Sequence, residues 1–137
     1  MSEIRTGDDP INNRTNKCIL IVDDEDDARS IAQLALQMQT DWTILLADCG
    51  QAALTIAAEQ QPDAILLDMM MPNMDGRTTL QNLKADSTTQ SIPVILVTAK
   101  VQSSEHNFHD LDVAAVFAKP YRPLQLASEI TKALRWE

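Results

Sequence analysis

Five short apolar segments, each followed by a segment of helical character, constrain the fold of this chain more than any other feature. They are unbroken apolar runs rather than alternating patterns, and they lie at residues 18–22, 42–47, 64–67, 92–98 and 114–118. Unbroken apolar strands are buried on both faces, which is typical of a parallel sheet with helices on each side. Right-handed crossovers make such a sheet doubly wound. We therefore predict an α/β fold built on a five-stranded parallel sheet.

The helices between these strands are predicted from apolar residues that recur three or four positions apart. Asp75 is expected to cap the third helix, since Asp is favoured at that position. The segment at 102–111 is the most polar of the five. The predicted helices are 27–38 (Ile31, Leu34, Ala35, Met38), one from Gly50 (Ala53, Leu54, Ala57, Ala58), one after Gly76 (Leu80, Leu83), 102–111, and one from Pro123 (Leu124, Leu126, Ile130, Leu134).

Length and charge limit the remaining possibilities. A chain of 137 residues fits one domain, which we place at residues 17–137 after a polar, flexible N-terminal tail at 1–16. The net charge of −9 disfavours nucleic acid and anionic membranes as partners. No apolar stretch approaches the ~20 residues that span a bilayer, and the N-terminus does not resemble a signal peptide. We therefore expect a cytoplasmic protein.

Polar residues stand at the ends of four of the five predicted strands. Asp23 and Asp24 follow the first strand, Asp68 the third, Thr98 ends the fourth, and Lys119 follows the fifth. In an open parallel α/β sheet, ligands bind outside the carboxyl ends of the strands, where the strand order reverses. We expect these side chains to meet at one edge of the sheet.

The chemistry of this set points to phosphoryl transfer. Three carboxylates in one cleft repel each other and call for a cation, and oxygen ligands suit Mg²⁺. A Lys ammonium and a Thr hydroxyl add groups that neutralise or bind phosphoryl oxygens. A carboxylate can itself act as the nucleophile and form an aspartyl-phosphate.

Four segments carry a resemblance to a known family. They are ILIVDDED (19–26), ILLDMMMPNMDG (65–76), IPVILVTAK (92–100) and AKPY (118–121). In this order and at this spacing, the chain resembles the receiver domains of two-component response regulators from about Lys17 to Trp136. The resemblance implies a flavodoxin-like (βα)5 fold and a switch protein that assists its own phosphorylation and dephosphorylation, rather than an enzyme with a separate substrate.

The resemblance also implies a role for each residue at the predicted edge. Asp68 would take phosphate from the phosphohistidine of a sensor kinase or phosphotransfer protein. Asp24, Asp68 and the backbone carbonyl of Met70 would hold Mg²⁺, with Asp23 orienting the ion or acting through water.

Two further residues would act on the phosphoryl group. Lys119 would pair first with the carboxylate and then with the phosphoryl oxygens, and its peptide bond to Pro120 would be cis. Thr98 would donate a hydrogen bond to the phosphoryl group.

The chain departs from the family at the position that often carries a signalling ring, three residues before the Lys. Val116 stands there, and Phe117 should face the opposite side of its strand. Asp112 replaces a common Gly. Met70 and Lys100 occupy positions near the path of the attacking water, and we hypothesise that Met70 slows hydrolysis by crowding that path.

Output is expected through protein contacts. The chain stops at Glu137, directly after the last predicted helix, so no attached output domain is expected. A separate protein partner or a homodimer through the face formed by residues 102–136 would then read the signal.

Three alternatives stay open from sequence. A phosphatase of the haloacid-dehalogenase type would need an acid where Met70 stands. A flavodoxin-like nucleotide binder would need a Gly/Ser/Thr-rich loop after the first strand, where this chain has the acidic residues 23–27. A pseudo-receiver, a pure interaction module, fits the missing ring but not the presence of Asp24, Asp68 and Lys119.

Overall fold

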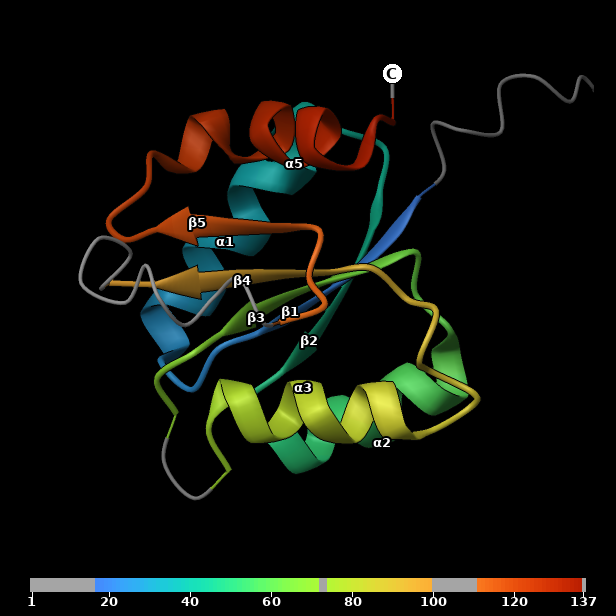
Figure 1. Cartoon of the computed structure of the whole chain (residues 1–137). Helices are drawn as coiled ribbons and strands as arrows, with labels where there is room; N and C mark the ends of the chain where they lie inside the picture. The colour runs from blue at the N-terminus through green and yellow to red at the C-terminus, as the bar shows by residue number, and fades with distance from the viewer. Residues whose placement is uncertain (1–16, 72–73, 100–110, 137) are drawn as a thin grey trace, which may run out of the picture.

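The molecule contains one parallel sheet with helices on both faces (Figure 1). The structure is a computed structural model that describes residues 17–71, 74–99 and 111–136. All four strand pairings are parallel, and the strand order is β2-β1-β3-β4-β5. The predicted five-stranded parallel α/β fold is therefore confirmed. The strands are β1 (Cys18–Val22), β2 (Thr43–Ala47), β3 (Ala64–Asp68), β4 (Val94–Thr98) and β5 (Ala115–Ala118).

The helices form two layers, with α1 and α5 on one face of the sheet and α2 and α3 on the other (Figure 1). Within the described residues, no helix has the length and apolar character to cross a membrane. The predicted tail at 1–16 and most of the predicted helix at 102–111 lie outside the described residues. The helices are α1 (Asp26–Gln39), α2 (Gly50–Gln60), α3 (Gly76–Ala85), the short 3₁₀ turn η3 (Pro123–Gln125) and α5 (Leu126–Leu134).

The sheet is buried on both faces because successive strand residues point to opposite helix layers. In β1, Leu20 and Val22 pack against the α2/α3 layer, while Ile19 and Ile21 pack against the α1/α5 layer. In β3 and β4, successive apolar residues likewise pack alternately against the α2/α3 layer and the α1/α5 layer. The unbroken apolar runs in the sequence thus reflect two cores, one on each side of the sheet.

Helix α1 forms where predicted, but a different face of it is buried. Ala32, Ala35 and Leu36 pack inward, and of the four apolar residues used to predict the helix only Ala35 is among them. Ile31, Leu34 and Met38 remain 51%, 58% and 67% exposed. The small side chains of the two alanines occupy the inward face, and the larger apolar residues form a row on the outer face. We call Ile31, Leu34 and Met38 the α1 stripe.

Candidate functional site

Three carboxylates meet at the carboxyl edge of the sheet, where the strand order reverses between β1 and β3. Asp23 and Asp24 follow β1 directly, and Asp68 is the last residue of β3. These two strands are neighbours, with Val22 paired to Leu67. One carboxylate oxygen from each acid lies within 4.8 Å of the other two. The predicted meeting of these three acids at one edge is observed.

Asp23 is fixed by bonds to two neighbouring elements. Its backbone N–H donates to Ala47 O at 3.1 Å, which ties the end of β1 to the end of β2. Its Oδ1 accepts the Glu25 N–H at 2.9 Å, and its carbonyl accepts from Arg29 Nη1 at 2.8 Å. The buried Asp23 carboxylate is therefore held by the residue just before α1, and the Asp23 carbonyl is held by Arg29 in the first turn of α1.

The Asp68 side chain is contacted by the loop that follows β3 and by Lys119. Its side chain is only 5% exposed. Oδ1 accepts the Met70 N–H at 3.1 Å and lies 3.3 Å from Lys119 Nζ. The same Nζ lies 3.7 Å from Asp23 Oδ2. The Lys119 ammonium group therefore forms ion pairs with both the Asp68 and the Asp23 carboxylates.

The charges in this cluster do not balance. Burial raises the pKa of Asp68, and the charge of Asp23 raises it further, which outweighs the lowering by the Met70 N–H and by Lys119. Burial alone would lower the pKa of Lys119, but the charges of Asp68 and Asp23 more than offset it and raise that pKa. With three carboxylates and one ammonium, the site has an excess of negative charge. Hard oxygen ligands in this number fit Mg²⁺.

Thr98 and Lys119 reach the same edge from β4 and β5. Thr98 is buried at the end of β4, and its carbonyl accepts the Lys119 N–H at 2.9 Å. The Lys119–Pro120 peptide bond is cis, as expected. Met70 is 66% exposed, and its backbone N–H donates to the Asp68 carboxylate. Lys100 lies outside the described residues.

The start of α3 packs against the backbone of Asp68, a relationship that the sequence did not reveal. Gly76 N–H donates to Met69 O at 3.0 Å. A Cβ on Gly76 would lie 2.5 Å from Asp68 O and 2.6 Å from Met69 Cα. The predicted cap is confirmed, because Asp75 Oδ1 accepts the Thr78 N–H at 2.9 Å. The proximity of Gly76 to Asp68 emerges only in three dimensions.

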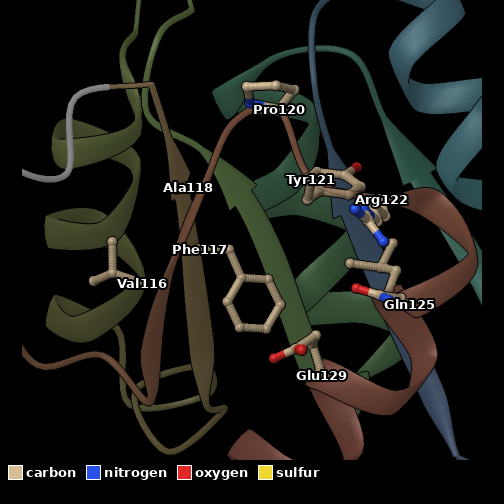
Figure 2. A pocket seen from close by; sticks show the side chains of 9 residues that line it. Val116, Phe117, Ala118, Pro120, Tyr121, Arg122, Gln125 and Glu129 are labelled. Atoms are coloured by element: carbon tan, nitrogen blue, oxygen red, sulfur yellow. The ribbon is translucent and has the colours of Figure 1, made fainter.

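Strand β5 presents different side chains to the two layers. Val116 packs against the core on the α2/α3 side, and Phe117 packs against the core on the α1/α5 side. Figure 2 shows these two side chains on opposite sides of the strand. The prediction that Phe117 faces away from Val116 is confirmed.

Known sequences resemble this chain over most of its length. A family model described as response regulator receiver domain matches residues 19–131. The phosphate regulon transcriptional regulatory protein PhoB of Pseudomonas aeruginosa is 36% identical over 121 residues, which cover 87% of this chain and 52% of PhoB. The chain spans about half the length of the first curated relatives it matches.

Solved structures agree with the fold. The N-terminal domain of a response regulator receiver protein from Methanoculleus marisnigri is 30% identical, with a TM-score of 0.64 over 86% of this chain and 96% of that one. The receiver domain of the sensor histidine kinase PA1611 from Pseudomonas aeruginosa has a TM-score of 0.77 at 24% identity, over 88% of this chain and 98% of that one. That structure contains a magnesium ion coordinated in its active site cleft.

Proposed function

This chain belongs to the response regulator receiver domain family, and on that premise we propose that it is a phosphoacceptor switch in which Asp68 takes the phosphoryl group. The observation that carries the proposal is the set of three carboxylates within 4.8 Å of one another, with Lys119 Nζ 3.3 Å from Asp68. Of the three acids, Asp68 is the one at the end of the central strand β3, contacted by both Lys119 and the Met70 N–H.

The proposed reaction is a transfer from a phosphohistidine of the partner kinase or phosphotransfer protein. An oxygen of Asp68 attacks the phosphorus, and a P–O bond forms as the P–N bond to the imidazole breaks. The electron pair stays on the ring nitrogen, which takes up a proton. Later attack by water releases inorganic phosphate and restores the carboxylate.

We assign a divalent cation to the acidic cluster. Asp24, Asp68 and the Met70 carbonyl are proposed as ligands of Mg²⁺, with Asp23 orienting the ion. When bound, Mg²⁺ supplies positive charge that offsets the carboxylates and the transferred oxygens. The magnesium ion in the cleft of the PA1611 receiver domain supports this assignment.

Lys119 and Thr98 are proposed to hold the phosphoryl group after transfer. The Lys119 ammonium already lies between Asp68 and Asp23, so it needs only a small displacement to pair with phosphoryl oxygens. The Thr98 hydroxyl is proposed to donate a hydrogen bond to the same group. Charge-assisted hydrogen bonds of this kind are about twice as strong as neutral ones.

The α1 stripe is proposed as the contact surface for the phosphodonor. Its residues are spaced three and four apart, which suits packing against another helix. A hollow of about 400 Å³, lined among others by Ile31 and Lys119, joins the stripe to the site. A helix lying on the stripe would therefore bring a phosphohistidine close to Asp68.

Variants of the stripe test this contact. Ile31→Ser and Met38→Ser should slow transfer from a phosphorylated kinase or phosphotransfer protein that phosphorylates the wild-type chain. Gln37→Ser, at an exposed position on α1 outside the stripe, is the matched control. All three variants should react normally with phosphoramidate, which needs no protein contact. Unchanged transfer in the stripe variants would place the donor elsewhere.

Other sequence-based expectations remain proposals. We propose that the chain signals through protein contacts, that its setting is cytoplasmic, and that its receiver domain begins near residue 17. A homodimer through residues 102–136 is one proposed form of output.

The experiment that tests the proposed function uses small phosphodonors. The protein is incubated with Mg²⁺ and acetyl phosphate or phosphoramidate, and its intact mass is measured. We expect one phosphoryl adduct, absent without Mg²⁺ and absent in Asp68→Asn. Mg²⁺ binding without any adduct would favour a pseudo-receiver, and turnover of small phosphomonoesters would favour a hydrolase.

A further inference from the structure

A groove lies between β5 and α5, on the α1/α5 side of the sheet (Figure 2). Its volume is about 370 Å³, and its walls include Phe117, Tyr121, Gln125 and Glu129. The hollow of about 400 Å³ beside Ile31 and Lys119 is a different pocket from this groove. Pro120 and Tyr121 lie at the boundary, because they line both pockets. These two residues therefore separate the β5–α5 groove from the hollow that Lys119 also lines.

Tyr121 is well placed to respond to the charge of the site. It follows Lys119 by two residues, and Lys119 pairs with both Asp68 and Asp23. Burial raises the pKa of Tyr121, and Asp23 and Asp68 raise it further while Lys119 lowers it. Its ring also packs against the core on the α1/α5 side. The Tyr121 side chain is thus affected by the charges of Asp23, Asp68 and Lys119, and it also forms part of the wall of the groove.

The opposite side of β5 offers no equivalent ring at position 116. Val116 packs toward the α2/α3 layer, and it lacks the flat surface and polar end of an aromatic side chain. Among the described residues at the end of β5 and directly after it, the aromatic side chains are Phe117 and Tyr121, which both pack on the α1/α5 side. If Phe117 or Tyr121 moves on phosphorylation, the movement would therefore change the face of β5 that packs toward α5.

We propose that Tyr121 is a positioning residue that couples phosphorylation of Asp68 to the shape of the β5–α5 groove. The proposal rests on the proposed function of Asp68. A phosphoryl group adds negative charge and three acceptor oxygens at the end of β3. The Lys119 ammonium shifts toward those oxygens, and the short connection through Pro120 transmits the shift to the Tyr121 ring. The ring then changes its position against Gln125 and Glu129.

The chain has one tyrosine, so a fluorine label on tyrosine reports on Tyr121 alone. Protein labelled with 3-fluorotyrosine should give a single ¹⁹F resonance that moves when phosphoramidate and Mg²⁺ are added. Intact mass measured on the same sample reports phosphorylation. A phosphorylated protein with an unmoved resonance would overturn the role of Tyr121 and leave the proposed function intact. A sample that takes no phosphate would overturn both.

Three variants separate coupling from a structural role. The readout is the change in the Gln125 and Glu129 backbone amide shifts on phosphorylation. Tyr121→Phe keeps the ring and should retain the change. Tyr121→Leu should lose more than half of it while Asp68 is still phosphorylated. Val113→Ala, at a residue that packs against the α2/α3 core and does not line the groove, should retain it. Loss in Val113→Ala together with retention in Tyr121→Leu would assign the coupling to the α2/α3 side and overturn the proposal.

Discussion

The Lys119 ammonium nitrogen lies 3.3 Å from Oδ1 of Asp68, although Asp68 ends β3, Lys119 follows β5, and β4 lies between these strands. This contact forms because β3, β4 and β5 run parallel and end at one edge. Among the described residues, Lys119 is the only basic residue that forms an ion pair with Asp68, the proposed nucleophile. The predictions below follow from this pairing and from what surrounds it.

Replacing Lys119 by methionine should slow phosphorylation by phosphoramidate on the order of 10²-fold, because a preorganised charge on the transferred oxygens is lost. Rates are measured by intact mass over time at fixed Mg²⁺. Lys84→Met is the matched control, since Lys84 pairs with Asp112 at 3.7 Å and takes no part in the acidic cluster. Equal rates in Lys119→Met and wild type would remove Lys119 from the reaction.

Without Mg²⁺, Asp68→Asn should be more stable than wild type at neutral pH. The folded protein raises the pKa of Asp68 above 3.8, chiefly by burial, so ionisation of Asp68 opposes folding. Wild type should lose stability as pH rises through the window above 3.8, and the variant should lose less. The two should converge below that pH, where Asp68 is neutral in both the folded and unfolded states.

Denaturant unfolding in EDTA across this pH range measures the difference. A variant that is equally or less stable than wild type at neutral pH would contradict the electrostatic account. It would mean that the Lys119 and Met70 contacts outweigh burial of the carboxylate.

Gly76→Ala should destabilise the protein by about 1–3 kcal/mol, the usual cost of forcing extra atoms into a packed site. The added Cβ would lie 2.5 Å from Asp68 O, and backbone atoms cannot rotate away as a side chain can. Displacement of Asp68 should also slow phosphorylation. Thr78→Ala, at an exposed position on the same helix, should change stability by less than about 0.5 kcal/mol. A well-tolerated Gly76→Ala would show that α3 can move away from β3.

Met70→Ala and Met70→Asn should lose phosphate severalfold faster than wild type. The exposed Met70 side chain follows Asp68 by two residues and is proposed to crowd the path of the attacking water. Decay of the phosphorylated form is followed by intact mass after the donor is removed. Met38→Ala, which truncates another exposed methionine far along α1, should decay like wild type. Decay in the Met70 variants that is no faster than in wild type would refute the crowding hypothesis.

The sequence predicted the sheet well because each strand is an unbroken apolar run, a pattern that burial on both faces requires. It also predicted the edge where Asp23, Asp24 and Asp68 meet, since the carboxyl ends of parallel strands lie together. Strand ends differ from the prediction by at most two residues, as at β4, which begins at Val94 rather than residue 92. The 102–111 helix remains a prediction.

The inward face of α1 could not be predicted because helical spacing identifies a helix but not which of two apolar faces meets the sheet. Ala32, Ala35 and Leu36 face inward, and the larger Ile31 and Met38 stay exposed. The proximity of Gly76 to Asp68 was also missed. It depends on how closely the start of α3 approaches β3, and that distance has no signature in local sequence.

Locating the acyl phosphate tests the central claim most directly. Protein phosphorylated by phosphoramidate and Mg²⁺ is reduced with borohydride, which converts an aspartyl-phosphate to homoserine, and the peptides are sequenced by tandem mass spectrometry. We predict homoserine at residue 68 and unmodified aspartate at residues 23 and 24. Homoserine at either of those positions, or none anywhere in a phosphorylated sample, would contradict the assignment of Asp68 as the phosphoacceptor.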